Sequence, residues 1–442
     1  MPLGEYDDSS ESDILRHSRQ LIGHTLREVT AVPEQVAEDK HKGRVGNLVE
    51  QYFFGIMPNS IPAPDFPRAG IELKVTGLKR SSRGKLVAKE RLVLNMINYH
   101  DIVEEVFEQC SLVLKCGKIL ILCYEYEKTK SSLDQRFTDK QFVYRLLAQD
   151  AEIIQSDWKI IQAKVQAGKA HELSEGDTFY LKANRKGSGG EKEKPSSQPF
   201  SEVPAMRRSF SLSSTYLTSI IDNSQPNDGV LGIEPGQTFE EATQARIGKF
   251  VGEKTSDLIS MFGLVKPGKK VSKSVRHTLI TKILSGGNSS VKELKRAGIE
   301  VKTVRLKADG RAREHMSFSA FDYKEILEGQ WEDSEFSEVL ERKFLFAVFQ
   351  DDQFGLEHFT KLVYWNMPYQ DRLQAQEVWE ETQARIQDGT YVFPQASATA
   401  VAHVRPHGRN AADTVQCPDG VFRGKKSFWL NQRYIETVVA NL

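Results

Sequence analysis

The segment PAPDFPRAGIELKVTGLKR (62–80) places two acids and a lysine in a stretch that is otherwise basic and apolar. From residue 71 onward, apolar and polar side chains alternate, which predicts a β-strand. A period of two puts Glu72 and Lys74 on one face of this strand, about 6–7 Å apart. Asp65 enters from the proline-rich turn that precedes the strand.

Two carboxylates held close together repel each other, and one of them keeps its proton unless a cation lies between them. A hard divalent metal such as Mg²⁺ relieves this repulsion and prefers oxygen ligands. A neighbouring lysine orients a water molecule, helps to deprotonate it, or stabilises developing charge. Asp65, Glu72 and Lys74 therefore predict metal-assisted hydrolysis of a phosphodiester bond.

The alternative interpretation is a half-buried strand with a surface Glu–Lys pair, because the pattern E-x-K is common in proteins. The dipeptide Pro-Asp (64–65) stands six residues before Glu-Leu-Lys (72–74). This spacing makes the pattern more specific than a bare E-x-K and favours the metal-site interpretation.

The segments of the first half recur in the same order in the second half, which predicts a duplicated domain. Trp379 and Gly389 keep the spacing of Trp158 and Gly168. The other matched pairs are RIGKFVGE (246–253) with RVGNLVEQ (44–51), RAGIEVK (296–302) with RAGIELK (68–74), AREHMSFSAFDYKEI (312–326) with AKERLVLNMINYHDI (88–102), KFLFAVFQD (343–351) with KILILCYEY (118–126), and KKSFWLNQRYIETVV (425–439) with RRSFSLSSTYLTSII (207–221).

The length of the chain also predicts two domains. It has 442 residues, and a single hydrophobic core stops growing at about 250–300 residues. We expect a first domain over 1–222, a linker over 223–237 and a second domain over 238–442. Both are expected to be of the α/β class. In the first domain the patterns predict helices over 13–30, 44–57, 137–168 and 211–222, strands over 71–76, 90–97, 118–126 and 178–183, and a loop over 184–205.

Charge and composition exclude several classes of protein. Sixty basic residues balance sixty acidic ones, so a polyanion-binding surface would have to come from local segregation. Basic residues concentrate over 68–91 and 266–307, whereas 322–341 is acidic. The cysteines and histidines lack zinc-binding spacings. No signal peptide or membrane-length apolar run is present, so we expect a cytoplasmic protein without membrane association.

Three segments of the first half carry a resemblance to a known family. KGRVGNLVEQYFFG (42–55), PDFPRAGIELKVTGLK (64–79) and AKERLVLNMINY (88–99) resemble the MutH-like family of repair and type II restriction endonucleases, which share the PD-(D/E)xK nuclease core. The duplicated layout, with an intact first copy and an altered second copy, is similar to the restriction-enzyme branch. The resemblance implies a restriction-endonuclease-like fold present twice as a tandem pseudo-repeat.

The resemblance also implies roles for the residues at the start of the strand. Asp65 and Glu72 would bind Mg²⁺, and the carbonyl of Leu73 would join them. Lys74 would be the catalytic lysine.

Two further residues of the site rest on the same resemblance. Glu50 matches the helix glutamate that supports the metal site in this family, with an ordinary solvent-facing glutamate as the alternative. Lys118 matches a lysine that the family places near the scissile phosphate. Lys115 lies close by, and an alignment could slip between the two lysines.

The resemblance places DNA recognition in two segments of the first half, YLKANRKG (180–187) and RRSFSLSS (207–214). Lysine, asparagine and arginine make paired hydrogen bonds with purine edges, although each of these residues could also be a solvated loop residue. Lys89 is expected to contact phosphates or to serve solubility. Ser211 stands where the mismatch-repair relatives carry an aromatic residue. The expected recognition residues are Lys182, Asn184, Lys186, Arg207, Arg208 and Ser211.

The second copy lacks part of the predicted metal site. It retains Glu300 and Lys302, but a glutamate, Glu293, replaces the aspartate, and Gly252 replaces the helix glutamate. Mg²⁺ requires near-octahedral ligation at about 2.0–2.1 Å, so the longer side chain predicts a silent or much weaker site.

The second copy is nevertheless expected to bind DNA. It carries a basic insertion (265–290), and Arg405, His407 and Arg409 lie in the counterpart of the first recognition loop. Trp429 stands where Ser211 does, and it would stack or wedge at a base step, with core packing as the alternative. A DNA-binding copy that does not cleave predicts allosteric activation of the first copy.

The sequence therefore predicts a Mg²⁺-dependent type II restriction endonuclease that cuts double-stranded DNA and leaves 5′-phosphates, at a GATC-type site by resemblance. One working site per chain predicts that two chains, as a dimer or a two-site DNA complex, or two sequential nicks are needed to break both strands. A restriction enzyme also implies a cognate DNA methyltransferase. Two alternatives stay open: a MutH-like nicking endonuclease of mismatch repair, and a non-catalytic DNA-binding regulatory protein.

Overall fold

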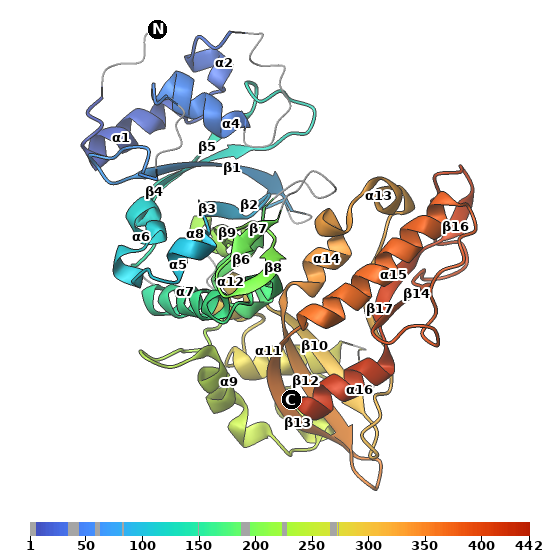
Figure 1. The fold of residues 1–442 in the computed structure, drawn as a ribbon. Coiled ribbons are helices and arrows are strands. Elements are labelled where there is room, and N and C mark those ends of the chain that lie inside the picture. The colour runs from blue at the N-terminus through green and yellow to red at the C-terminus, as the bar shows by residue number, and fades with distance from the viewer. Residues whose placement is uncertain are drawn as a thin grey trace.

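Figure 1 shows the computed structural model of the chain, in which two similar halves pack against each other. The structure describes residues 6–33, 44–57, 62–81, 84–148, 150–186, 195–222, 228–265, 272 and 274–442. Parts of the predicted recognition loop, linker and basic insertion (187–194, 223–227 and 266–271) lie outside the described residues. Within the described ranges, no helix combines the length and the apolar character needed to span a bilayer.

The first half is built on a four-stranded sheet in the order β2-β1-β4-β5. β1 (Glu72–Arg80) runs parallel to β4 (Lys118–Glu125) with Glu72 opposite Ile119. β2 (Leu86–Ala88) pairs with β1 and forms one edge of the sheet. The two strands that the sequence predicted around the metal site are therefore confirmed, and they lie side by side at the centre of the sheet.

The other edge of this sheet corrects the sequence prediction. Residues 136–145 form the strand β5, paired antiparallel with β4, and not the beginning of a helix over 137–168. Aromatic and β-branched residues are frequent in this stretch, which favours an extended chain on a half-buried sheet. The helix α7 (Ala151–Gln166) follows and buries Trp158, as predicted.

A second sheet of three antiparallel strands, β3-β9-β6, carries the predicted recognition segments. Its strands are β3 (Leu92–Met96), β9 (Arg208–Leu212) and β6 (Leu181–Arg185). The helix α8 (Ser214–Ile221) follows β9 directly. The predicted loop 184–205 contains a short hairpin of β7 (Ser196–Gln198) and β8 (Ser201–Ala205).

The second half repeats this architecture, which confirms the predicted duplication. Its two sheets have the orders β10-β12-β13 and β11-β17-β14. Glu300 lies opposite Phe344, as Glu72 lies opposite Ile119. The strands are β10 (Glu300–Leu306), β11 (Met316–Ala320), β12 (Lys343–Asp351), β13 (Glu357–Asn366), β14 (Ala402–Pro406) and β17 (Lys426–Leu430), with a hairpin of β15 (Thr414–Gln416) and β16 (Phe422–Gly424).

Helices cover the outer faces of these sheets. In the first half they are α1 (Glu11–Ser18), α2 (Leu26–Val29), α4 (Arg44–Leu48) continued by a π-helical turn (Val49–Phe53), α5 (Tyr99–Ile102) and α6 (Ser111–Cys116), with α7 and α8. In the second half they are α9 (Phe239–Ile247), α10 (Thr255–Met261), α11 (Val275–Leu284), α12 (Lys292–Ala297), α13 (Tyr323–Glu328), α14 (Glu335–Leu340), α15 (Tyr369–Gln387) and α16 (Gln432–Asn441). Short 3₁₀ helices are Arg19–Leu21, Phe107–Gln109, Ala170–Glu172, Glu175–Asp177, Gly248–Phe250 and Trp331–Asp333.

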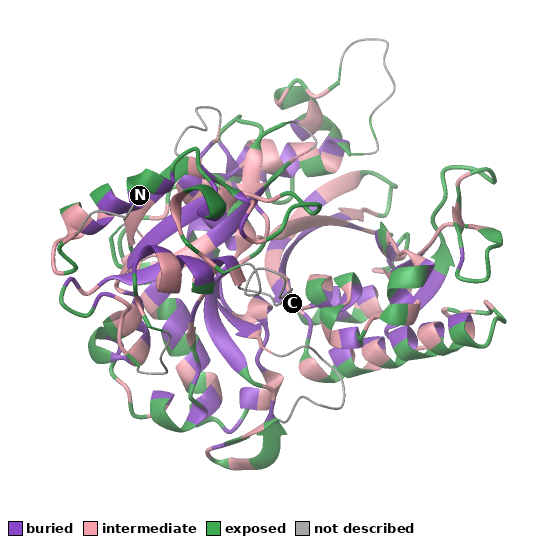
Figure 2. Cartoon of the chain, turned by 90° about the horizontal axis from the view of Figure 1, so that it is seen from above, coloured by how far each residue is buried: buried purple, intermediate pink, exposed green. Residues whose placement is uncertain are grey.

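One hydrophobic cluster contains buried residues of both halves, and each half has a further cluster of its own. Phe179 of the first half stacks on Phe239 of the second at a centroid distance of 4.1 Å. Leu231, inside the predicted linker, is buried in the same cluster of side chains. Figure 2 shows the strands buried inside and the helices exposed along their outer faces. The sequence limits proposed for the two domains stay a prediction.

Candidate active site

The start of β1 brings an acid from a turn onto the strand that carries Glu72 and Lys74. Asp65 Oδ2 accepts a hydrogen bond from the backbone N–H of Leu73 at 2.8 Å. The chain reverses direction through Gly70, whose φ of 65° lies in the left-handed region that favours glycine. The turn therefore fixes the Asp65 carboxylate at the first residues of the strand.

Glu72 and Lys74 form an ion pair, which agrees with their predicted position on one face of the strand. Lys74 Nζ lies 2.6 Å from Glu72 Oε1, and Lys115 Nζ lies 3.7 Å from the same oxygen. The Glu72 side chain is 3% exposed. Its other oxygen, Oε2, is buried and has no hydrogen-bond partner among the described residues. An unpaired buried carboxylate oxygen is costly, so it marks a place that a cation would fill.

Glu50 belongs to the same electrostatic cluster. It lies in the π-helical turn after α4, and α4 packs against β1. Burial, and next the negative charge of Asp65, raise the pKa of Glu50 to about 7, while Lys74 opposes the shift. Burial also raises the pKa of Glu72. Mutual repulsion among carboxylates in a partly buried site is the condition that binding of a cation relieves.

A metal ion at this site would have few protein ligands. Within the described ranges, no three His, Cys, Asp or Glu side chains form a metal-binding group. The predicted ligands are the carboxylates of Asp65 and Glu72 and the backbone carbonyl of Leu73, all of them oxygen donors. Mg²⁺ keeps several water ligands and is commonly bound by one or two carboxylates together with substrate phosphates, so this donor set fits it. The assignment of these three ligands stays a prediction.

The two candidate lysines near β4 have different surroundings. Lys118 Nζ donates to the carbonyl of Ala69 at 2.7 Å and lies 3.8 Å from Glu11, so it supports the turn before β1. Lys115, from the last turn of α6, lies beside Glu72. The resemblance favours Lys118 over Lys115, because the sequence does not show which way the end of α6 faces.

The structure buries several predicted recognition residues of the first half. Lys182 is 4% exposed, and its Nζ donates to the carbonyl of Thr178 at 2.6 Å. Asn184 accepts a hydrogen bond from Arg91. Ser211 is fully buried in β9. These side chains do not face solvent in this arrangement of the two halves.

Acidic residues of the second half cover this face. Arg208 Nη2 lies 3.0 Å from Glu341 Oε1, and Arg185 lies 3.3 Å from Glu332. Arg91 lies 3.7 Å from Glu338. A cavity of about 500 Å³ between the halves is lined by Arg91 and Arg185 of the first half and by acidic residues of the second, Glu332, Glu338 and Glu341 among them. The sequence shows the acidic run 322–341 but does not indicate what it contacts.

The remaining first-half candidates are less enclosed. Arg207 is exposed, and its carbonyl accepts the N–H of the half-buried Lys186 at 2.8 Å. Lys89 is half-buried, with its ammonium 4.3 Å from the ring centroid of Tyr126 and 3.3 Å from Glu90. These positions are compatible with phosphate contacts, which stay a prediction.

The counterpart face of the second half is open. Arg405, His407 and Arg409 are exposed, and Trp429 is half-buried between strands β11 and β14. The guanidinium of Arg405 lies 5.4 Å from the centroid of the Trp429 ring, and the His407 ring lies 5.7 Å from it. The second half therefore presents a basic, aromatic surface where the first half is covered.

The altered carboxylates of the second copy have other partners. Lys302 Nζ pairs with Glu300 at 2.8 Å, as in the first copy. Glu293, however, accepts the backbone N–H of Leu231 at 2.9 Å. Gly252, in place of the helix glutamate, has no carboxylate to offer. The geometry agrees with a silent second site, which stays a prediction.

A buried histidine makes the stability of the second half depend on pH. Burial lowers the pKa of His403 to about 4, although its hydrogen bond with Asn431 acts in the opposite direction. The folded state then binds fewer protons than the unfolded state, in which histidine titrates near pH 6.5. The contribution of His403 to the free energy of unfolding is therefore fully present above about pH 6.5. It is lost, by up to about 3 kcal/mol, as pH decreases toward 4.

Denaturant unfolding at pH 7 and at pH 4.5 measures this effect. We expect His403→Gln to lose less stability between the two pH values than the unmodified chain, because glutamine does not titrate. An equal loss in both proteins would show that His403 does not stay neutral in the folded state.

Comparison with known proteins agrees with this geometry. The family model described as the DNA mismatch repair enzyme MutH matches residues 54–157 and 284–377. The type II restriction enzyme Sau3AI of Staphylococcus aureus is 30% identical over 484 aligned positions, which cover 96% of this chain and 97% of that protein. The DNA mismatch repair protein MutH of Serratia proteamaculans is 26% identical over 170 positions, 37% of this chain and 71% of that protein.

The two matched regions each contain the start of a central parallel pair, β1 with β4 and β10 with β12. The match to the restriction enzyme extends through both halves, whereas the match to the repair protein covers little more than a third of the chain. The chain therefore belongs to the Sau3AI/MutH family of restriction and repair endonucleases, with the MutH-like domain present twice.

Proposed function

We propose that this chain is a Mg²⁺-dependent type II restriction endonuclease that hydrolyses phosphodiester bonds of double-stranded DNA at a GATC-type site and leaves 5′-phosphates. The first half would cut, and the second half would bind DNA without cutting. The observation that carries the proposal is the unpaired, buried Oε2 of Glu72, next to Lys74 and on the strand that Asp65 caps.

The residues of the first half supply the functions that this reaction needs. Asp65 and Glu72 would hold the metal, which when bound would activate water and neutralise charge at phosphorus. Lys74 fixes one oxygen of Glu72 and leaves the other free, and its ammonium would orient the attacking water. Lys115 adds a second positive charge beside Glu72 for the scissile phosphate.

The exposure of the predicted DNA-binding residues supports different roles for the two halves, with cleavage by the first and DNA binding by the second. The surface around Arg405 and Trp429 is exposed, whereas Arg208 is buried against Glu341 of the second half. DNA would therefore engage the second half first, and the first half would need to separate from Glu341 before it reads its own site. This order supports the allosteric behaviour proposed for the second copy.

Plasmid cleavage tests the proposed function. With Mg²⁺ we expect a defined ladder of linear fragments, and with EDTA we expect intact plasmid, because the acidic cluster needs the cation for catalysis. Open circles without linear product would instead indicate a nicking enzyme of the repair type. DNA that is shifted in a gel but stays uncut at every Mg²⁺ concentration would indicate a non-catalytic DNA-binding protein.

The nicking alternative has less support. The MutH protein of Serratia proteamaculans matches 37% of this chain, which is less than the two halves together. The non-catalytic alternative has less support because Glu50, Asp65, Glu72 and Lys74 are all present and electrostatically coupled.

Because one half would bind DNA and the other would cut it, we expect efficient cleavage to require two recognition sites. We expect a plasmid with one recognition site to be cut slowly, and we expect a short duplex carrying the site, added in trans, to accelerate cutting. In the closed arrangement, Glu341 of the second half covers Arg208 of the first. The duplex would occupy the second half and shift the chain toward an open arrangement in which this contact is broken. Quench-flow or timed gel assays measure the rates, with a scrambled duplex as control. Equal rates with and without the specific duplex would contradict this order of binding.

A further inference from the structure

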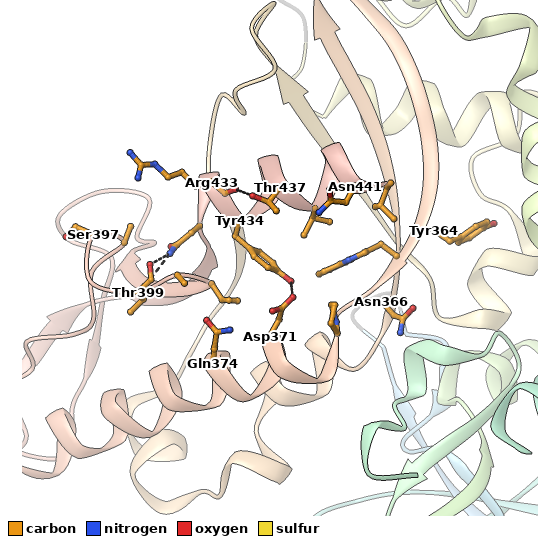
Figure 3. Close-up of a pocket in the computed structure, with 18 residues that line it drawn as sticks. Tyr364, Asn366, Asp371, Gln374, Ser397, Thr399, Arg433, Tyr434, Thr437 and Asn441 are labelled. Atoms are coloured by element: carbon orange, nitrogen blue, oxygen red, sulfur yellow. Dashed lines mark hydrogen bonds between the residues drawn. The ribbon is translucent and has the colours of Figure 1, made fainter. Parts of the chain in front are cut away.

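Two cavities of the structure contain acids that have different partners. In the larger cavity, of about 1070 Å³ in the second half, Asp371 Oδ2 accepts the Tyr434 hydroxyl at 2.7 Å. Figure 3 shows that Arg433, which lines the same cavity, points away from this pair. The cavity of about 500 Å³ between the halves instead brings acids and arginines together, with Arg91 of the first half near Glu338 of the second. The smaller cavity therefore contains basic groups that a polyanion would contact after the acids withdraw.

Arg91 lies on the face of the sheet β3-β9-β6 that carries the predicted recognition residues. It directly precedes β3, and the strand period of two places it on the side of Val93. Val93 is opposite Ser211, and Ser211 is opposite Lys182, so the three side chains share one face. Arg91 Nη1 also donates to Asn184 Oδ1 of β6. Arg91 therefore belongs to the same surface as these recognition candidates.

An acid of the first half holds the Arg91 guanidinium in one orientation. Its Nη1 donates to Glu175 Oε1, which lies in the 3₁₀ helix Glu175–Asp177. The side chains of Arg91 and Glu175 are 26% and 17% exposed. A phosphate contact tolerates a mobile side chain, whereas reading of a base edge requires a fixed one. This orientation therefore favours a base contact over a phosphate contact.

The contacts of Arg91 also determine which edge of its guanidinium can bind a ligand. The bonds to Glu175 and Asn184 both use Nη1, so the edge formed by Nε and Nη2 is left for a ligand. Nη2 lies 3.7 Å from Glu338 Oε1 of the second half. When the halves separate, this edge loses the Glu338 carboxylate and is able to donate to an acceptor on DNA.

We propose that Arg91 reads a guanine of the recognition site, with Glu175 as the residue that positions it. This inference rests on the function proposed above. In the major groove, guanine presents two acceptors, N7 and O6, and the arginine fork bonds both of them. Lysine carries the same charge without the fork, so it replaces an arginine at a phosphate better than at a guanine.

Cleavage of two duplexes by the full-length chain tests the proposal. One duplex carries the GATC-type site, and in the other 7-deazaguanine replaces each guanine of the site, which removes N7 and keeps the base pairing. We expect the unmodified chain to cut the modified duplex at least about tenfold more slowly, because a charge-assisted hydrogen bond is lost. We expect Arg91→Lys to cut the two duplexes within about threefold of each other. Any effect of the modified base on the second half is common to both proteins and cancels when their rate ratios are compared.

Two further variants accompany this measurement. Arg80→Lys is the matched control, because Arg80 is 61% exposed and pairs with Glu125 at 2.6 Å. It should keep the rate ratio of the unmodified chain. Glu175→Ala removes the acid that orients Arg91, so it should lower the ratio as Arg91→Lys does. Thermal melting establishes that each variant is folded.

The outcomes separate this inference from the proposed function. The inference is overturned if the unmodified chain cuts both duplexes at the same rate, or if folded Arg91→Lys or Glu175→Ala keeps the full ratio. In these cases, cleavage of the unmodified duplex still supports the proposed function. An unmodified chain that leaves this duplex uncut with Mg²⁺ would overturn the proposed function, and this inference with it.

Discussion

Asp65→Asn is expected to lower the rate of DNA cleavage by at least about 10³-fold, because it removes a charge from the predicted metal site. Asparagine retains an oxygen that can accept the Leu73 N–H, the bond that Asp65 makes at 2.8 Å. The turn before β1 should therefore stay in place while the affinity for the cation falls. Timed plasmid cleavage at increasing Mg²⁺ concentration measures the loss, and gel-shift titration without Mg²⁺ shows whether DNA binding is retained.

The second copy provides a matched control for this substitution. Glu293 is the repeat counterpart of Asp65 and accepts the Leu231 N–H at 2.9 Å. Glu293→Gln retains an acceptor for that bond and should change the cleavage rate less than about threefold, since a silent site contributes no chemistry. If Glu293→Gln were as damaging as Asp65→Asn, both copies would be cutting. If Asp65→Asn cut at the normal rate, the nuclease site would have to lie elsewhere.

The sequence predicted the core of this site because its determinants are local. A strand period of two places the side chains of Glu72 and Lys74 on one face of the strand, whatever surrounds it. The turn at Gly70 returns the chain so that Asp65, only a few residues earlier, lies at the start of the same strand. The duplicated fold was predictable for a similar reason, since six matched segments in one order require two copies of the same topology. Both predictions used information that lies within short stretches of chain.

The positions of the lysines and of the recognition residues depend on longer-range contacts. Lys115 approaches Glu72, whereas Lys118 contacts the Ala69 carbonyl. This difference depends on how the end of α6 packs against the sheet, which no local sequence pattern predicts. Lys182 and Arg208 have the chemistry of DNA contacts, yet both are buried, Lys182 with its ammonium on the Thr178 carbonyl and Arg208 against Glu341 of the second half. An acidic run such as 322–341 predicts a positive partner, but not which one.

Glu341→Gln is expected to raise the rate at a single-site plasmid at least about tenfold and to remove most of the acceleration by a duplex in trans. Burial by itself would raise the pKa of Glu341, but Arg208 and Arg372 lower it below the usual range, so the group is ionised in the closed arrangement. Arg208 Nη2 and Arg372 Nη1 lie 3.0 and 3.2 Å from the same oxygen, Oε1.

A neutral side chain at position 341 leaves two buried guanidinium groups without the carboxylate that both of them contact. Breaking a buried ion pair by removing one partner typically costs about 3–5 kcal/mol. The open arrangement does not bear this cost, because there Arg208 is solvated or meets a DNA phosphate. The substitution therefore shifts the population toward the form in which the first half can read DNA.

The comparison variant is Glu335→Gln, an exposed acid on the neighbouring helix α14. It removes one negative charge from the same region, so it controls for a general gain in attraction to DNA. Cleavage of one-site plasmid, with and without the trans duplex, should differ between the two variants, and melting curves should show both to be folded. A folded Glu341→Gln protein that cuts one-site DNA as slowly as the unmodified chain would mean that the acidic face does not restrain the first half. The closed arrangement would then be a stable assembly of two domains that DNA leaves intact.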